Sequence, residues 1–170
     1  MTSTALNLNY LQVKKGIFSW IFSVDHKRIG LLYLYSLITF FLVGATLGVL
    51  MRLELLNPGK DLFEAQTYNQ IFTMHGVIMI FLFIIPSIPA VFGNFFLPIM
   101  LGTDDVSFPR LNLLSWWIYI IGAIMALSTL IFGDGPADTG WTFYAPYSVK
   151  TGTNVTMSVL AAFVLGFSSI

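Results

Sequence analysis

The sequence predicts an all-α fold, a transmembrane helix bundle with three complete spans and a truncated fourth, preceded by an interfacial helix. Two observations predict this class. Of the 170 residues, 56% are hydrophobic and only 9% are charged, whereas soluble domains carry about 25% charged residues. In addition, apolar blocks alternate with short polar connections, and three of these blocks are long enough to cross a hydrocarbon core of about 30 Å.

Composition also limits the chemistry that the chain can carry. The formal net charge is zero and no basic cluster is large enough to follow a phosphate backbone, which excludes nucleic-acid binding and leaves membrane lipids as expected partners. The chain contains no cysteine, which excludes structural disulfides, thiolate-bound metals and iron–sulfur clusters within it. A metal bound here therefore requires histidine, methionine or oxygen ligands.

The elements follow in order along the chain. Residues 16–22, GIFSWIF beside lysines, are typical of a short helix lying at the membrane surface. Residues 30–51 contain no charge, and as a helix these 22 residues would rise roughly 33 Å. Residues 71–100 form a second apolar block, interrupted by Pro86, Pro89, Gly93 and Pro98. This block predicts one long, kinked or tilted helix, since neighbouring helices can satisfy the carbonyls that proline leaves without a donor.

Two further apolar blocks complete the bundle. Residues 111–133 predict a third span, with Trp116 and Trp117 near its start, where an interfacial aromatic belt would lie. After a Gly- and Pro-rich loop, residues 155–170 provide only 16 apolar or small residues, which is short for a crossing. We expect this block to end inside a helix.

The basic residues of the loops predict the orientation. One side of the predicted bundle carries Lys14, Lys15, Lys27, Arg28 and Arg110, and the other carries Arg52, Lys60 and Lys150. The positive-inside rule therefore places the N-terminus on the inner side of the membrane. The second span then runs from outside to inside. It puts His75 in its outer third and leaves Asp104 and Asp105 at the inner surface.

His75 is the one histidine within an apolar block, and an imidazole without partners in hydrocarbon is costly. Two interpretations stay open. The residue is either a packed histidine hydrogen-bonded to another helix, or an axial haem ligand that binds iron through one nitrogen and donates through the other. Gly76 beside it would leave room for a porphyrin, and Met79 follows four residues later.

Other polar residues also have a structural and a functional interpretation. Asp104 and Asp105 are either solvated surface groups or a proton entry leading to polar side chains such as Asn94 and Asn112.

At the outer face, Arg52 and Glu54 are interfacial anchors, or the arginine pairs with a haem propionate or another buried acid. The indole N–H of Trp141 is able to serve the same propionate, although an aromatic ring at the membrane surface needs no such role.

Six segments together resemble a known family. They are DHKRIG (25–30), MRLEL (51–55), YNQIFTMHGVIM (68–79), GNFFLPIMLGTDDVSFPRLN (93–112), GWTFYAP (140–146) and GFSSI (166–170). In this order they resemble the N-terminal part of subunit I of the haem–copper oxygen reductases, A type, over nearly the whole chain. The resemblance implies part of the catalytic subunit of a cytochrome c oxidase, which reduces dioxygen to water with electrons from cytochrome c and pumps protons.

The resemblance also implies roles for individual residues. His75 would be an axial ligand of a low-spin haem, expected to be haem A, with Gly76 and Met79 beside it, Arg52 near a ring substituent and Trp141 near a propionate. Asp105 would be the entry acid of the D proton pathway, followed by Asn94, Asn112, Ser168 and Ser169. Glu54 and Gly59 resemble contributors to a calcium or sodium site.

The chain departs from the family pattern at several positions. Asp104 stands where the family usually has proline, and Leu113 replaces a frequent second asparagine. Quinol-oxidising members share Gln70 but differ from this chain where it has Val43, Leu47 and Thr67. Those members carry arginine, aspartate and histidine at these three positions, which favours cytochrome c over the alternative donor, quinol.

The family places its high-spin haem and copper ligands in later helices, and this chain has no histidine after residue 75. The resemblance thus implies that residues 1–170 are the N-terminal part of a single transmembrane domain, which is truncated or is one piece of a longer subunit. The fragment alone lacks the oxygen-reduction site. The implied partners are the other oxidase subunits, of types II and III, in the bacterial plasma membrane or the mitochondrial inner membrane. Two rival functions are a cofactor-free proton-coupled transporter, with His75 and Asp105 as relay groups, and a non-catalytic membrane scaffold.

Overall fold

The computed structural model of the chain describes residues 16–59 and 62–169, and this part of the chain contains helices and loops but no strand. The elements are α1 (Ile17–Ile21), α2 (His26–Glu54), α3 (Ala65–Val77), η1 (Ile78–Ile84), η2 (Ser87–Phe92), α4 (Gly93–Leu101), α5 (Pro109–Ser128), α6 (Tyr147–Lys150) and α7 (Val155–Phe167). The predicted all-α fold is confirmed. Lys14, Lys15, Lys60 and Ile170 lie outside the described residues.

Three helices are long and apolar enough to cross a membrane: His26–Glu54, Ala65–Leu101 and Pro109–Ser128. The shorter apolar helix Val155–Phe167 follows them. The chain is an integral membrane protein, and the prediction of three spans and a shorter fourth is confirmed. The first span starts earlier than expected because Asp25 caps α2, its carboxylate accepting the backbone N–H groups of Lys27 at 2.8 Å and Arg28 at 3.4 Å.

The third span ends earlier than predicted. Its helix stops at Ser128, and the next residues form turns rather than continuing to residue 133. Gly133 has a φ of +75°, which only glycine adopts without strain, and the Asn154 side chain donates to the Phe132 carbonyl. These local interactions compete successfully with helix extension. At the other end, Pro109 occupies the first turn, where its missing N–H has no cost.

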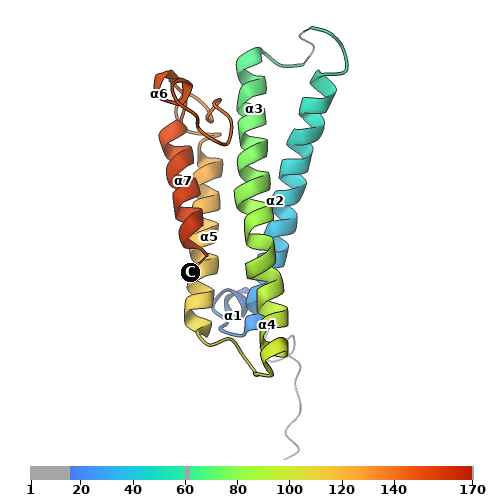
Figure 1. Cartoon of the computed structure of the whole chain (residues 1–170), viewed down its shortest axis with the longest axis vertical. Coiled ribbons are helices and arrows are strands. Elements are labelled where there is room, and N and C mark those ends of the chain that lie inside the picture. The colour runs from blue at the N-terminus through green and yellow to red at the C-terminus, as the bar shows by residue number, and fades with distance from the viewer. Residues whose placement is uncertain (1–15, 60–61, 170) are drawn as a thin grey trace, which may run out of the picture.

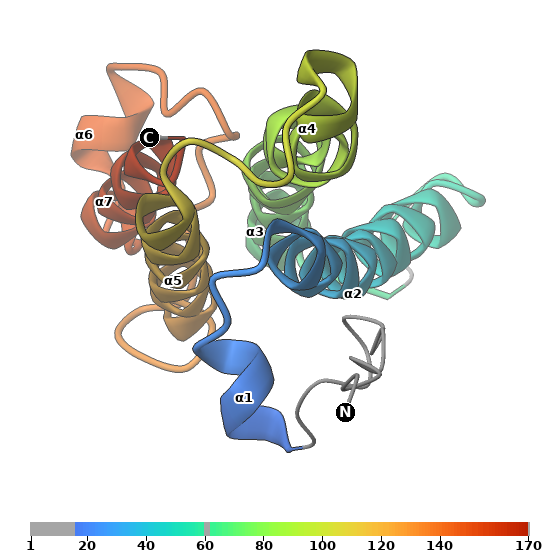
Figure 2. The same cartoon turned by 90° about the horizontal axis from the view of Figure 1, so that it is seen from below.

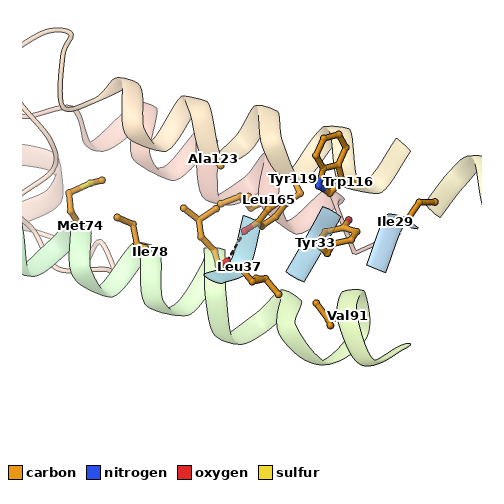
Figure 3. Packing of buried hydrophobic residues seen from close by; sticks show 11 residues of the cluster. Ile29, Tyr33, Leu37, Met74, Ile78, Val91, Trp116, Tyr119, Ala123 and Leu165 are labelled. Carbon is orange, nitrogen blue, oxygen red and sulfur yellow. Dashed lines mark hydrogen bonds between the residues drawn. The ribbon is translucent and has the colours of Figure 1, made fainter. Parts of the chain in front are cut away.

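The long helices α2, α3 with its continuation through α4, and α5 run along one long axis together with α7 (Figure 1). The connection between α4 and α5 lies at the same end as α1, and α6 lies at the opposite end. Seen along the axis, α5 lies beside α7, whereas α3 and α4 lie next to α2 (Figure 2). The buried core joins these two groups of helices and includes Ile29, Tyr33 and Leu37 of α2, Ile78 and Leu82 of η1, and Tyr119 of α5 (Figure 3).

In the long second span, a neighbouring helix compensates for the missing N–H of Pro86. Pro86 has no N–H with which to bond the carbonyl of Leu82 four residues earlier. The Tyr119 hydroxyl donates to that carbonyl from α5 at 2.7 Å, drawn as the dashed line in Figure 3. The flanking stretches η1 and η2 have wide, π-helical turns. A neighbouring helix therefore satisfies the carbonyl that proline leaves without a donor.

Replacing Tyr119 with phenylalanine is expected to destabilise the protein by about 1–2 kcal/mol, because a buried carbonyl loses its donor. The measurement is the unfolding of the full-length protein in detergent. Tyr35→Phe is the matched control, since Tyr35 is 62% exposed on α2. Equal stability of the two variants would show that the Leu82 carbonyl needs no donor from α5.

Candidate functional site

The imidazole of His75 packs against α2 and has a defined tautomer. Its Nδ1 lies 2.8 Å from the carbonyl oxygen of Gly44. A carbonyl only accepts hydrogen bonds, so Nδ1 carries the hydrogen and the lone pair of the neutral ring is on Nε2. Nε2 is therefore the atom that is able to ligate a metal. A backbone carbonyl that accepts the N–H of the other ring nitrogen, and so fixes the tautomer, is typical of metal-binding histidines.

Two glycines of α2 form the groove in which His75 lies. A Cβ atom at Gly48 would be 3.0 Å from His75 Cε1, and one at Gly44 would be 2.7 Å from the sulfur of Met79. Small residues four apart allow membrane helices to approach closely. His75 and Met79, also four apart, thus share one groove. This groove was not predicted from the sequence, although the segment GATLG (44–48) carries its signal.

Gly76 lies against a loop residue rather than against α2. A Cβ atom at this position would be 2.9 Å from Cδ1 of Trp141, so the indole packs directly on the helix backbone. The Trp141 ring also meets Phe81 edge-on, with centroids 6.3 Å apart, and is 41% exposed. His75 and Gly76 are neighbours on α3. The His75 ring packs against α2, whereas Trp141 packs on the same turn of α3 from the loop.

Arg52 lies in the last turn of α2 and is exposed. Gly44, Gly48 and Arg52 are spaced four residues apart, which puts them along one side of the helix. Arg52 therefore lies on the same side of α2 as the groove formed by Gly44 and Gly48. It is nearer the end of α2 that leads to α3.

Four of the five predicted proton-pathway residues line one cavity of about 220 Å³ in the other half of the bundle. They are Asn94, Asn112, Ser168 and Ser169. Asn94 and Asn112 form a reciprocal amide pair, with Asn94 Nδ2 at 3.3 Å from Asn112 Oδ1 and the Asn112 amide donating to Asn94 Oδ1. Asn94 is buried. The cavity therefore has amide and hydroxyl groups with which waters can bond.

Two further polar residues of this cavity were missed. Tyr33 and Ser115 also line it, and their hydroxyl oxygens are 2.9 Å apart. Ser115 donates its hydrogen to the Asn112 carbonyl at 2.7 Å, so Tyr33 is the donor between the two. The signal for Ser115 was its position one helical turn after Asn112. Nothing in the sequence distinguished Tyr33 from a core aromatic.

Asp105 lies outside the cavity, in the connection between α4 and α5. Its side chain is 44% exposed. One oxygen, Oδ1, accepts the Val106 N–H at 2.7 Å and lies 2.8 Å from Nδ1 of His26. His26 is buried at the start of α2. The contact between these two residues was not predicted, because they are far apart in the chain. Asp104 is exposed beside them.

Glu54 and Gly59 both line an open hollow near the end of α2. The Glu54 side chain is buried, and its Oε2 accepts the N–H groups of Leu62 at 2.8 Å and Phe63 at 3.0 Å. Among the described residues lining the hollow, Glu54 is the one carboxylate. The described part of the chain contains no cluster of three or more histidines and acids suited to a metal ion.

Comparisons with known proteins identify relatives along the whole length of the chain. Residues 28–170 match the family model described as cytochrome c and quinol oxidase polypeptide I. A protein from Streptomyces avermitilis named putative cytochrome c oxidase subunit 1-beta is 38% identical over 171 residues, covering 99% of this chain and 30% of that protein. Cytochrome c oxidase subunit 1 of Thermostichus vulcanus is 41% identical over 150 residues, covering 88% of this chain and 27% of its own. The chain thus spans less than a third of the length of these relatives.

Proposed function

The chain belongs to the cytochrome c and quinol oxidase polypeptide I family, and on this premise we propose that it is part of the catalytic subunit of a respiratory terminal oxidase. The complete enzyme would reduce dioxygen to water with electrons from cytochrome c and would pump protons. This part of the subunit would supply one ligand of a low-spin haem and the entrance of a proton pathway. The oxygen-reduction site would lie in the remainder of the subunit.

The bond between His75 Nδ1 and the Gly44 carbonyl carries this proposal. It favours the tautomer whose Nε2 lone pair is available to iron, and it orients the ring. The donor chemistry thus fits an axial haem ligand. When bound, a haem of type A would supply one-electron transfer. Gly44 and Gly48 would hold the imidazole in place, and Met79 would pack beside it.

Two more residues would interact with the periphery of the haem. Arg52 would pair with a polar ring substituent, since it follows the His75 groove along α2. Trp141 would donate its indole N–H to a propionate, since the ring packs on α3 at Gly76.

The proton pathway would begin at Asp105. Its exposed carboxylate would take up a proton from water, and His26 at 2.8 Å would hold Oδ1 and orient the acid. The next groups would be Asn94 and Asn112, whose amides orient water without titrating. Tyr33 and Ser115 would continue the path, and so would Ser168 and Ser169, because these four residues line the same cavity as the two amides.

Electron donor, location and partners also belong to the proposal. Val43 and Leu47 are apolar, and no charge is available there to bind a quinol, which supports cytochrome c as donor. Lys27, Arg28 and Arg110 favour an N-terminus on the inner side of a bacterial plasma membrane, with subunits of types II and III as neighbours. Glu54 and Gly59 would contribute to a calcium or sodium site.

The visible absorption spectrum of the full-length protein, purified from its membrane, tests this function. We expect a Soret band and a low-spin haem α-band that respond to dithionite. A purified, folded protein without a Soret band would instead favour the proton-coupled transporter, in which His75 and Asp105 act without a cofactor.

Replacing Gly48 with alanine is expected to shift the α-band and the reduction potential of the low-spin haem, because the added methyl group would lie 3.0 Å from His75 Cε1. Gly166→Ala is the matched control, since a Cβ atom at Gly166, on helix α7, meets nothing within 4 Å. Identical spectra for the two variants would contradict the contact between Gly48 and the haem ligand.

A further inference from the structure

Asp138 is a buried carboxylate to which none of the roles above has been given. It lies in the loop between α5 and α7 and is 6% exposed. Three hydroxyl groups donate to it: Tyr147 to Oδ2 at 2.8 Å, and Thr151 and Thr153 to Oδ1 at 2.9 Å each. Tyr147 belongs to α6, and the two threonines precede α7. The carboxylate therefore ties together three stretches of the segment at this end of the bundle (Figure 1).

The hydrogen bonds keep this carboxylate ionised. Burial alone raises the pKa of Asp138, but the hydroxyl groups of Tyr147, Thr153 and Thr151 lower it by more, so the pKa lies below the usual aspartate range. A carboxylate that holds its charge and is saturated with donors is poorly suited to take up protons near neutral pH. These interactions are typical of a fixed structural anchor rather than a proton relay.

The residues next to Asp138 dock on α3. The backbone N–H of Gly140 donates to Oγ1 of Thr73 at 2.8 Å, and Thr73 is fully buried. Gly140 has a φ of +79°, a backbone conformation that favours glycine. The next residue, Trp141, places its indole on Gly76. Thr73 and Gly76 are one turn apart on α3 and lie on either side of His75 in the sequence.

We propose that Asp138 is a positioning residue that fixes Trp141 on α3 and thereby sets the surroundings of the His75 site. Trp141 is 41% exposed, so burial alone does not hold it in place. The anchor lies three residues before the indole, and the Gly140 hydrogen bond lies between them. The consequence for a haem rests on the function proposed above, whereas the positioning of Trp141 does not.

The first test measures amide hydrogen exchange of residues 136–147 in the full-length oxidase. Asp138→Asn is expected to speed exchange in this segment by about tenfold or more, because the hydroxyl groups lose a charged acceptor. Asp134→Asn is the matched control, an exposed aspartate of the same loop. Thr153→Val, which removes one donor, should give a smaller change in the same direction. Equal exchange in Asp138→Asn and Asp134→Asn would overturn the proposal.

The second test measures the reduction potential of the low-spin haem in Asp138→Asn, Trp141→Phe and the double variant. If Asp138 acts through Trp141, its substitution shifts the potential, and this shift disappears in the Trp141→Phe background. A shift that persists there, or an unshifted potential in Asp138→Asn, would overturn the effect on the haem. A haem band that survives His75→Ala would reject the function proposed above. The exchange result would still support the positioning of Trp141.

Discussion

Replacing His75 with alanine in the full-length oxidase is expected to abolish the low-spin haem absorption band. The imidazole would supply a ligand to the iron, and the methyl group of alanine has no lone pair to replace it. The loss should be complete rather than graded, since the substitution removes Nε2, the atom that the Gly44 hydrogen bond leaves available to iron. The measurement is the reduced-minus-oxidised spectrum of the purified complex, together with its haem content.

His26→Ala is the control for this experiment because it removes the other histidine of the chain. His26 lies at the start of α2 and contacts Asp105, far along the helix from Gly44. The low-spin band should persist in His26→Ala. A wild-type spectrum in His75→Ala would assign the histidine a packing role on α2 and nothing more.

Replacing Asp105 with asparagine is expected to slow turnover by about tenfold or more, because an amide does not take up a proton. Proton uptake should slow in parallel, while both the haem content and the first reduction of the low-spin haem stay unchanged. The amide oxygen of asparagine still accepts the Val106 N–H, so the loop should keep its conformation. The measurement is oxygen consumption and proton uptake by the variant in vesicles.

Asp104→Asn provides the matched control. The two aspartates are adjacent and both exposed, but Asp105 is the one in contact with His26. We expect wild-type turnover in Asp104→Asn. Slow turnover in that variant and normal turnover in Asp105→Asn would transfer the entry role to Asp104.

Much of the fold was predictable because membrane spans depend on local composition. The 22 uncharged residues 30–51 predicted α2, and the Asp25 cap accounts for its earlier start. The predicted end of α5 was wrong by several residues, since Ile131 and Phe132 are apolar and yet lie in a turn and a bend. A donor from Asn154, more than 20 residues later, satisfies the Phe132 carbonyl there. The hydropathy pattern of a segment does not predict such contacts with distant residues.

The candidate site was predictable to a smaller extent. The motifs identified Asn94, Asn112, Ser168 and Ser169, and these four residues line one cavity. The contact of His26 with Asp105 was missed, because 79 residues separate them in sequence. Asp138 was missed for another reason. A single aspartate in a polar loop is usually solvated, and its three hydroxyl partners follow 9 to 15 residues later.

The long second span has an electrical consequence. His75 and Asn94 are 19 positions apart on this span, which corresponds to at most about 28 Å along an α-helix, close to the thickness of the insulating layer, about 30 Å. With the roles proposed above, electrons would enter near one end of this helix and protons near the other. When an electron and a proton meet inside the membrane, charge would then be displaced across the layer. This displacement would come in addition to that of any pumped proton. A voltage of 100 mV opposes that displacement by about 2.3 kcal/mol per elementary charge. The membrane potential would therefore slow respiration.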